Sequence, residues 1–398
     1  MGPFELYLPT KLIFGAGGFS RLGTEAKAFG KTVLLVKTEG PLEGLGVYAK
    51  AAAFLEEAGL RVVTLEGVEE NPKLRFVYEG ERICREENVD LIVAVGGGSA
   101  IDCAKAIAAA AANEGDIWDY FEAKKTISSS LPVGAVSTIA ATGAELSVHC
   151  VITNEGQERK LAIHNTLNLP RFAIIDPQLQ ATLPRRATAC GMTDIISHVS
   201  ESYFENEGQL LSDRFAEGIV QTVFDCEKVL DDPGNLDLRG ELAWASIWAI
   251  CGITDAGRSS YVYGAHEIAH GVAAVHDTVH GATLAVLHPA WLHHMLASGL
   301  HPDKYAQFAV RVMGMTGGAL GEKGIEAPGE KGIEAPGEKG IEALKEKYIS
   351  WGMPRSLKEL GVSEDRLKDI ADSTVSNPIS PLNDSREVLE VLESCFDI

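Results

Sequence analysis

The chain has 398 residues, of which 45% are hydrophobic, and its 56 acidic and 35 basic residues give a formal net charge of −21. This length favours two domains and this composition a soluble globular fold, while the negative charge disfavours nucleic acid and anionic membranes as partners. No apolar run is long enough to span a bilayer, and residues 1–5 do not open a basic region followed by an apolar core, so we expect a cytoplasmic protein.

Strand-like and helix-like segments alternate through the first third of the chain. Apolar β-branched runs predict strands, and a three-to-four spacing of apolar residues predicts helices. Strands that are apolar along their whole length, such as Leu91–Val95, are typical of a parallel sheet covered by helices on both faces. We therefore predict an α/β, Rossmann-like dinucleotide-binding domain over residues 1–183. Its expected elements are strand 32–36, helix 48–57, strand 61–65, helix 74–87, strand 90–95, helix 100–112 and strand 131–136.

The strand signals fade after Pro184, and segments 210–230 and 237–253 show the spacing of amphipathic helices. We therefore predict an all-α second domain over residues 184–398. The boundary is expected between Asp176 and Pro184, where two prolines bracket a turn-prone segment.

An eight-residue unit, GEKGIEAP, occurs at Gly321–Pro328, recurs at Gly329–Pro336 and begins again at Gly337. The units are too short and too few for a solenoid. Because proline and glycine interrupt helices at each junction, we interpret residues 321–343 as a repeat-containing surface insertion, essentially a loop.

Histidine and aspartate side chains gather in the second domain at spacings that suit a metal ion. Asp194 and His198 stand four residues apart, so on a helix they would project from one face about 6 Å apart. His266 and His270 repeat this spacing, and His280 follows ten residues later. Carboxylate and imidazole ligands without a thiolate suit Fe(II), Zn(II) or Mn(II). The alternative is that these are unrelated core or surface histidines.

One metal ion can contact both His266 and His280 only if the helix between them breaks. A continuous helix would separate the two residues by about 21 Å along its axis. Gly271 could end the first helix, and Asp277 or Thr278 could cap the next one. We therefore predict a break between His270 and His280.

A glycine-rich segment, Gly96–Lys105, follows the apolar strand Leu91–Val95 and precedes a helix. Glycines let the backbone approach a pyrophosphate, whose charge the helix N-terminus would meet. The spacing is not G-x-G-x-x-G, so a plain strand-to-helix connection is the alternative. The segment Thr138–Glu145 offers hydroxyls and amides for phosphate or ribose, or is a simple loop.

These motifs, together with Asn71-Pro72 and Ala173–Pro177, resemble in order the iron-containing (group III) alcohol dehydrogenases of the dehydroquinate-synthase-like fold. The resemblance implies that Asp194, His198, His266 and His280 bind the metal, iron before zinc, and that His270 lines the catalytic pocket as a proton relay. It implies a homodimer. The cofactor residues it implies are Thr38, Asn71, Gly97, Gly98, Ser99, Asp102, Thr138, Thr142, Ser147, Lys160 and Leu179.

The chain most resembles the butanol-dehydrogenase and aldehyde-reductase branch, through Glu114–Asp119 and Leu287–Trp291. NAD-preferring relatives carry an aspartate where this chain has Thr38. Without that carboxylate, Lys37-Thr38 could accommodate a 2′-phosphate, so we expect NADP(H) to be preferred over NAD(H), although an inward-turned Glu39 would restore NAD(H).

The resemblance thus implies hydride transfer between NAD(P)(H) and small primary alcohols or aldehydes at a metal ion. Alternatives within the fold are a glycerol or other polyol dehydrogenase, a glycerol-phosphate dehydrogenase and a dehydroquinate-synthase-like lyase. A non-catalytic metal or nucleotide sensor is the alternative from another class.

Overall fold

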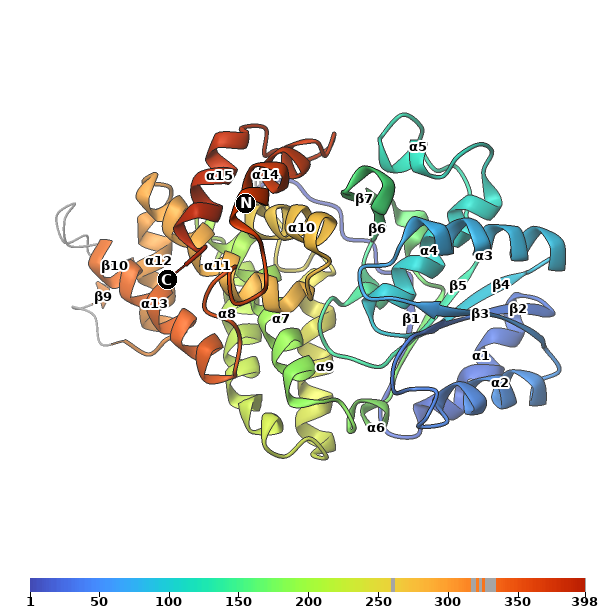
Figure 1. Cartoon of the computed structure of the whole chain (residues 1–398). Helices are drawn as coiled ribbons and strands as arrows, with labels where there is room; N and C mark the ends of the chain where they lie inside the picture. Colours follow the sequence, from blue (N-terminus) through green and yellow to red (C-terminus); the bar gives the residue numbers. More distant parts are fainter. Residues whose placement is uncertain (259–261, 316–319, 322–323, 326–333, 398) are drawn as a thin grey trace.

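The computed structural model describes residues 1–258, 262–315, 320–321, 324–325 and 334–397 (Figure 1). In this part of the chain a six-stranded parallel sheet has the order β1-β8-β5-β4-β2-β3. Its strands are β1 (Lys11–Phe14), β2 (Thr32–Thr38), β3 (Arg61–Val68), β4 (Leu91–Gly96), β5 (Val133–Ser137) and β8 (Phe172–Ile175). An antiparallel hairpin joins β6 (His149–Asn154) to β7 (Arg159–His164), and β9 (Leu320–Gly321) pairs with β10 (Gly324–Ile325).

The helices divide between the two halves of the chain (Figure 1). Those of the first half are α1 (Leu22–Ala26), α2 (Val47–Glu57), α3 (Leu74–Glu87), α4 (Gly98–Ala112), α5 (Trp118–Phe121) and α6 (Pro177–Gln180). Those of the second half are α7 (Arg185–Phe204), α8 (Leu210–Asp225), α9 (Leu236–Ile250), α10 (Gly264–His276), α11 (His280–Ala297), α12 (Pro302–Arg311), α13 (Glu334–Ser350), α14 (Leu367–Val375) and α15 (Ser385–Ser394).

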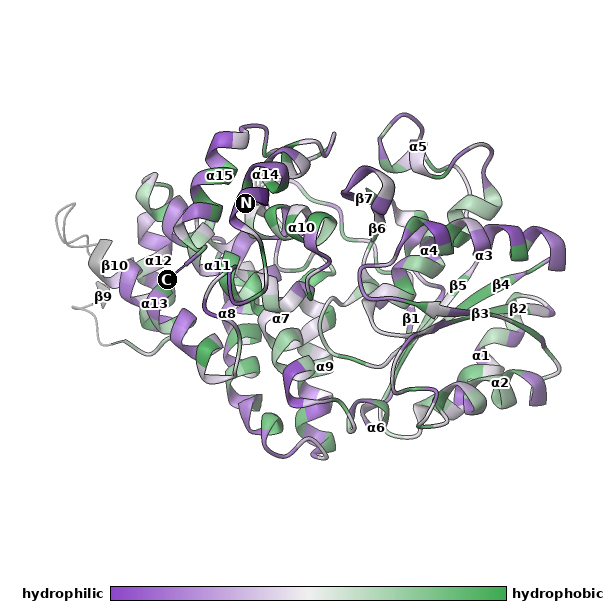
Figure 2. Cartoon of the chain, viewed as in Figure 1, coloured by the Kyte–Doolittle hydropathy of each residue, from purple (hydrophilic) through white to green (hydrophobic). Residues whose placement is uncertain are grey.

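The parallel sheet is covered on both faces, as the apolar strands predict. Alternate residues of β2 point to opposite sides: Leu34 and Val36 pack with α3 and α4, whereas Val33 and Leu35 pack with α1 and α2. Every residue of β4 is buried, and Figure 2 colours this strand as hydrophobic. The predicted α/β half with a mostly helical second half is therefore confirmed.

Two parts of the sheet region are absent from the predicted elements. β1 is the strand at one edge of the sheet, and it pairs with β8, which is the last strand of this sheet along the chain. The β6–β7 hairpin lies between α4 and α10, so it connects the α/β half with the helical half. β1 and β8 have only four residues each, and β6 and β7 mix polar with apolar residues, so the periodic signal of these strands is weak.

The interpretation of residues 321–343 as a surface loop is wrong for the third copy of the repeat. That copy belongs to α13, where Ile341 and Leu344 are buried and α12 and α11 pack alongside. Pro336 does not break this helix because it stands in the first turn, where backbone N–H groups have no partner within the helix. Most of the first two copies lies outside the described residues.

The helical half is built around α7, which is buried from Thr188 to Phe204. α8, α9, α12 and α13 share one apolar cluster with it, while α10, α11, α14 and α15 form another. Among the described helices, none combines the length and apolarity needed to cross a membrane. The burial of α7 matters for function, because polar side chains on it are enclosed by protein.

Candidate metal and dinucleotide site

Three polar side chains on α7 lie in the buried middle of the molecule. Asp194, His198 and Glu201 follow one another at four and three residues, so they share one face of the helix. Each is almost fully buried. Buried polar groups are unfavourable unless they bind a partner, and the partners here come from α10 and α11.

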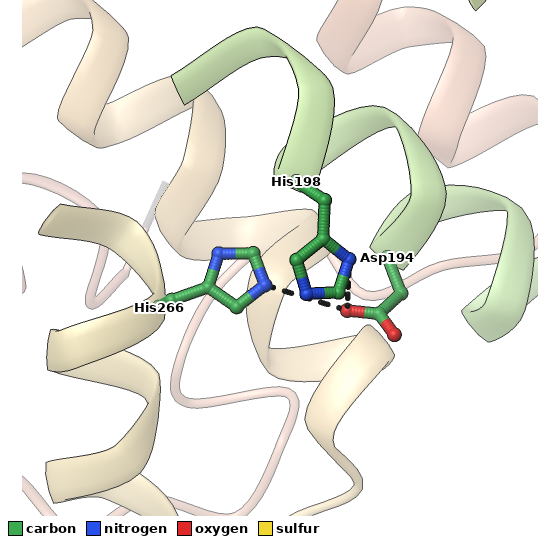
Figure 3. Close-up of side chains that lie close together, drawn as sticks. All are labelled: Asp194, His198 and His266. Carbon is green, nitrogen blue, oxygen red and sulfur yellow. Dashed lines mark ion pairs between the residues drawn. The ribbon is translucent and has the colours of Figure 1, made fainter. Parts of the chain in front are cut away.

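Asp194, His198 and His266 meet with ligand atoms within 4.8 Å of one another (Figure 3). Oδ1 of Asp194 lies 3.6 Å from Nδ1 of His198 and 3.5 Å from Nε2 of His266. The two imidazoles lie next to each other, with ring centroids 4.3 Å apart and ring planes tilted by 31°. These side chains therefore converge on one point although two come from α7 and one from α10.

His280 joins this cluster because the helix breaks as predicted. α10 ends at His276 and α11 begins at His280, which brings Nε2 of His280 within 3.7 Å of Oδ1 of Asp194. The predicted means of the break was wrong. Gly271 lies inside α10, and Asp277 ends that helix in a left-handed conformation (φ 51°) instead of capping α11, which follows Val279.

The atoms that face one another in this cluster lack hydrogen-bond partners among the described residues. They are Oδ1 of Asp194, Nδ1 of His198 and Nε2 of His266; in His280 the unpartnered nitrogen is Nδ1, whereas Nε2 is the one that faces Asp194. Leaving several buried polar atoms unpaired is costly. One carboxylate oxygen and three imidazole nitrogens are a donor set that a divalent metal ion satisfies, so the residues present fit such an ion.

The electrostatics of the cluster couple its members. Burial opposes the ionisation of Asp194, but the surrounding histidines hold its pKa below the ordinary value. Burial lowers the pKa of His198 to about 4 and that of His280 well below its ordinary value. His266 differs: burial would lower its pKa, but Glu201 and Asp194 raise it to about 10.

Glu201 holds His266 from behind. Its Oε1 lies 2.5 Å from Nδ1 of His266, and the same carboxylate accepts hydrogen bonds from the hydroxyl of Ser197 and the backbone N–H of Ala265. This contact directs Nε2 of His266 toward Asp194, in the way that carboxylates orient metal-binding histidines.

The glycine-rich segment lies at the carboxyl edge of the sheet, where parallel α/β proteins bind nucleotides. β4 ends at Gly96, Gly97 has an extended backbone, and α4 begins at Gly98, followed by Ser99. A Cβ on Gly98 would lie 2.5 Å from Oγ1 of Thr142, so this close approach requires glycine. The two small-residue segments predicted to hold the dinucleotide are therefore neighbours.

The other predicted cofactor residues of this region surround α4. Thr138 follows β5 and donates its N–H to the Gly96 carbonyl at 3.0 Å. The hydroxyl of Ser147 accepts the N–H of His149 at 3.1 Å. Asp102 accepts the N–H of Val151 through Oδ2, while its buried Oδ1 has no hydrogen-bond partner in the described part of the chain. Hydroxyls and amides thus gather beside the glycine-rich loop.

The remaining predicted cofactor residues, Thr38, Leu179 and Asn71, either lie beside other elements than α4 or have side chains that already bond to protein groups. Thr38 ends β2, with its hydroxyl 2.8 Å from the hydroxyl of Tyr48, and Leu179 lies on α6 and packs partly against the sheet. Asn71 accepts a hydrogen bond from Nζ of Lys160 at 2.7 Å, and its amide nitrogen donates to the α10–α11 turn.

His270 lies one turn beyond His266 on α10 and stacks on His280, with ring centroids 5.6 Å apart. Its Nδ1 is buried without a hydrogen-bond partner in the described structure. Burial and the nearby Lys160 keep its pKa well below the ordinary value, so the ring is neutral. His270 therefore adjoins the cluster without meeting Asp194.

Comparison with known proteins decides the family. Residues 9–177 match the family described as iron-containing alcohol dehydrogenase, and residues 188–395 match the C-terminal part of the Fe-containing alcohol dehydrogenase family. NADH-dependent butanol dehydrogenase A of Clostridium acetobutylicum is 34% identical, with 99% of each chain covered. The chain belongs to the iron-containing alcohol dehydrogenase family. The resemblance read from its motifs is confirmed.

Two further matches connect this iron-containing alcohol dehydrogenase with the predicted branch. The NADPH-dependent aldehyde reductase of Escherichia coli is 34% identical over 81% of this chain and 83% of its own. The crystal structure of NADH-dependent butanol dehydrogenase A from Thermotoga maritima superposes with a TM-score of 0.92 at 34% identity, covering 100% of this chain and 99% of that one. Some relatives are thus named for NADH and others for NADPH. The family match therefore supports dependence on NAD(P) but does not distinguish NAD from NADP.

Sequence reasoning missed three polar residues of this iron-containing alcohol dehydrogenase. Glu201 could have been found, because it lies three residues after His198 on the face that carries Asp194. His149 and His164 could not, since they meet only through the β6–β7 register, with ring centroids 4.2 Å apart. Burial holds the pKa of both rings below the ordinary value.

Proposed function

We propose that this chain is a metal-dependent aldehyde reductase and alcohol dehydrogenase, which exchanges hydride between NAD(P)(H) and small primary aldehydes or alcohols. The observation that carries the proposal is the convergence of Asp194, His198, His266 and His280, of which the first three turn buried atoms without a hydrogen-bond partner among the described residues toward one another. A structural role would have paired these atoms with protein groups.

Asp194, His198, His266 and His280 would hold the metal ion, which we propose to be Fe(II), with Zn(II) as the alternative. The donor set admits both, and iron is favoured by the family to which the chain belongs. When bound, such an ion polarises a substrate oxygen as a Lewis acid. The protein supplies enclosure, because Asp194, His198 and His266 are buried and the side chain of His280 is only 21% exposed.

His270 would hold the proton that the substrate oxygen gains or loses. It stacks beside His280 but does not meet Asp194, and its pKa is held low, so it stands as a neutral imidazole able to accept a proton. We expect His270→Ala to keep the metal but lose turnover, whereas His266→Ala should lose both. Loss of metal from the His270→Ala protein would contradict this division of roles.

The dinucleotide would lie along the carboxyl edge of the sheet. The first turn of α4 and the backbone of Gly97, Gly98 and Ser99 would meet the pyrophosphate. Asp102, Thr138, Thr142, Ser147 and Lys160 would surround the remainder, and Leu179 would pack near the adenosine. Lys160 suits this role, because its ammonium has three donors and one bond, to Asn71, accounts for only one of them.

We propose a preference for NADP(H) over NAD(H). No carboxylate stands at Thr38, and the adjacent Lys37 supplies a cation at the end of β2. Lys37 pairs with Glu66 at 2.9 Å and faces Glu43 at 3.7 Å, so a 2′-phosphate would compete with these carboxylates. Lys37→Ala should therefore raise KM for NADPH and leave KM for NADH unchanged.

Three coarser features complete the proposal. The chain would divide into domains at residues 1–183 and 184–398, a division that the two family matches, ending at 177 and beginning at 188, support. The protein would be cytoplasmic, as its soluble composition suggests, and a homodimer, as the family resemblance implies. Light scattering of the purified protein would test the dimer.

The deciding experiment starts from anaerobically purified protein, stripped of metal and reloaded with Fe(II) or Zn(II). Elemental analysis gives the metal content, and the loss of NADPH or NADH absorbance with butanal gives the activity. Oxidation of glycerol in the same assay tests the polyol alternative. Absence of turnover with every aldehyde, alcohol and metal, while metal and dinucleotide still bind, would favour the sensor instead.

A further inference from the structure

The turn that carries His280 into the cluster is fastened to the α/β half of the molecule. It consists of residues 277–279, between α10 and α11. Oδ1 of Asp277 accepts hydrogen bonds from Nδ2 of Asn71 at 3.0 Å and from Nζ of Lys73 at 2.5 Å. Nδ2 of Asn71 also donates to the carbonyl of Thr278 at 3.0 Å. We call Asn71, Lys73, Asp277 and Thr278 the clasp.

Lys73 makes the clasp tight. Its side chain is only 4% exposed, whereas that of Asp277 is 58% exposed. A buried ammonium that loses its carboxylate is left as an uncompensated charge, which is strongly unfavourable. Lys73 is itself fixed, because it forms a parallel bridge with Thr153 of β6, whose N–H donates to Pro72 at 2.9 Å. The position of Asp277 is therefore set by the β6–β7 hairpin.

Asn71 connects the clasp to Lys160, one of the predicted cofactor residues. Its backbone is left-handed (φ 51°), a conformation that asparagine tolerates better than most residues. Its amide oxygen accepts Nζ of Lys160, and its amide nitrogen donates to Asp277 and Thr278. Both ends of this side chain are thus committed to protein, so Asn71 bridges Lys160 to the turn.

The turn of residues 277–279 also determines where α11 begins. The N–H of Asp277 closes α10 on the carbonyl of Ala273 at 3.0 Å, and the hydroxyl of Thr283 donates to that of Thr278 at 2.8 Å. His280 follows immediately, and Nε2 of this residue lies 3.7 Å from Oδ1 of Asp194. A shift of the turn would carry His280 away from the other three members of the cluster.

We propose that Lys73 and Asp277, aligned by Asn71, are positioning residues that hold His280 in the metal site. The inference rests on the proposed function, since it takes His280 to be a metal ligand. According to this proposal, both halves of the chain determine the position of the fourth ligand, His280. Asp194, His198 and His266 depend on α7 and α10, whereas His280 depends also on contacts across to β6 and β7.

The test measures the Zn²⁺ affinity of the full-length, metal-free protein by competition with a chromogenic chelator. Four proteins form a cycle: the wild type, Lys73→Met, His280→Ala and the double variant. We expect Lys73→Met to weaken Zn²⁺ binding by about 10–100-fold, the range typical of residues that orient ligands. In the His280→Ala background the same change should alter affinity less than about twofold, because the residue it acts through is gone.

Two further variants guard against trivial effects. Asp277→Asn removes the negative charge that compensates buried Lys73 while keeping the size of the side chain, and it should reproduce Lys73→Met even if loss of the buried lysine prevents folding. Lys11→Met removes an ion pair of similar length, 2.6 Å to Glu25, far from the cluster, and should leave Zn²⁺ affinity unchanged.

The outcomes separate the two hypotheses. If His280→Ala weakens Zn²⁺ binding but Lys73→Met and Asp277→Asn do not, the clasp proposal is overturned and the ligand assignment stands. Equal effects of Lys73→Met in both backgrounds would also overturn it, because the lysine would then act without His280. If His280→Ala leaves affinity unchanged, the proposed ligand set is wrong and the clasp proposal falls with it.

Discussion

At the metal cluster, side chains from α7, α10 and α11 converge, and those from α7 and α10 leave buried atoms without a partner in the described structure, whereas at the dinucleotide edge the chain offers mainly backbone. The first region is built from side chains, and its chemistry lies in residue identity. The second depends on the absence of side chains at Gly97 and Gly98 and on the start of a helix. Substitutions should therefore act differently in the two regions: metal content changes in one, cofactor affinity in the other.

Gly281→Ala should have the largest effect on the metal cluster, because it separates the helices that build it. A Cβ at this position would lie 2.3 Å from the carbonyl oxygen of Cys190, which is backbone of α7 and cannot move aside. We expect a loss of about 1–3 kcal/mol in the free energy of unfolding, and loss of bound metal, because His280 moves away from Asp194. Urea unfolding and elemental analysis measure the two.

Gly218→Ala is the matched control, since nothing lies within 4 Å of a Cβ built there on α8. It should stabilise the protein by about 0.5–1 kcal/mol and leave the metal in place. Full metal content and unchanged stability in the Gly281→Ala protein would show that contact between α7 and α11 does not determine the position of His280.

Glu201→Gln should weaken metal binding without removing the site. The change takes away the negative charge 2.5 Å from Nδ1 of His266 but keeps the shape, so we expect Zn²⁺ affinity to fall about 10–100-fold when it is compared at a pH where His266 has lost its proton in both proteins. KM for the dinucleotide should not change. Glu267→Gln is the control, because that carboxylate neighbours His266 in sequence but bonds to Asn377. Equal affinities in the Glu201→Gln and wild-type proteins would contradict an orienting role.

Metal affinity should rise with pH, because a proton on His266 must leave before the ion binds. Glu201 and Asp194 raise the pKa of His266 to about 10 against the effect of burial, so the metal-free protein is stabilised by this proton below pH 6.5 and loses that contribution as pH rises through about 10. Zn²⁺ affinity should therefore increase about tenfold per pH unit in this window. Chelator competition at two pH values measures the slope, and Glu201→Gln should flatten it.

Most residues of the metal cluster could be predicted from the sequence, but fewer of the contacts that surround the cluster could be. Asp194 and His198 could be paired because helical spacing is local, and the break before His280 because a continuous helix would have been too long. The means of that break could not be read, since Asp277 takes a left-handed backbone held by contacts to Asn71 and Lys73, more than 200 positions away. Long-range packing of this kind leaves no periodic trace.

The dinucleotide edge shows the complementary limit. Gly96–Ser99 was recognisable from its place between a strand and a helix, yet its spacing alone left a plain connection equally open. Asn71 was assigned through resemblance, whereas its side chain here joins Lys160 to the α10–α11 turn. A site formed mainly by backbone groups has no characteristic side chains. Its residues can be recognised only from their neighbours in the folded chain.

Gly98→Ala should affect the second region alone. The added methyl group would press on the side chain of Thr142, at 2.5 Å from Oγ1, and push the two loops apart where the pyrophosphate is expected. We expect KM for NADPH to rise about tenfold, equivalent to about 1.4 kcal/mol, with kcat and metal content retained. Steady-state kinetics and elemental analysis test this. A loss of metal would show that the two regions are not independent.

Removing one repeat unit, residues 321–328, should change both regions least. The next unit is identical, so the sequence leading into α13 is preserved, and a shorter connection alters the closure entropy by about 0.6 kcal/mol or less. Ile341→Ala provides the contrast, because this buried side chain of the third copy packs in the helical half and its loss should cost about 2–5 kcal/mol. Thermal unfolding and kcat compare the variants. If the deletion were as damaging as Ile341→Ala, the length of the repeat, and not only its packed third copy, would support the helices behind the metal cluster.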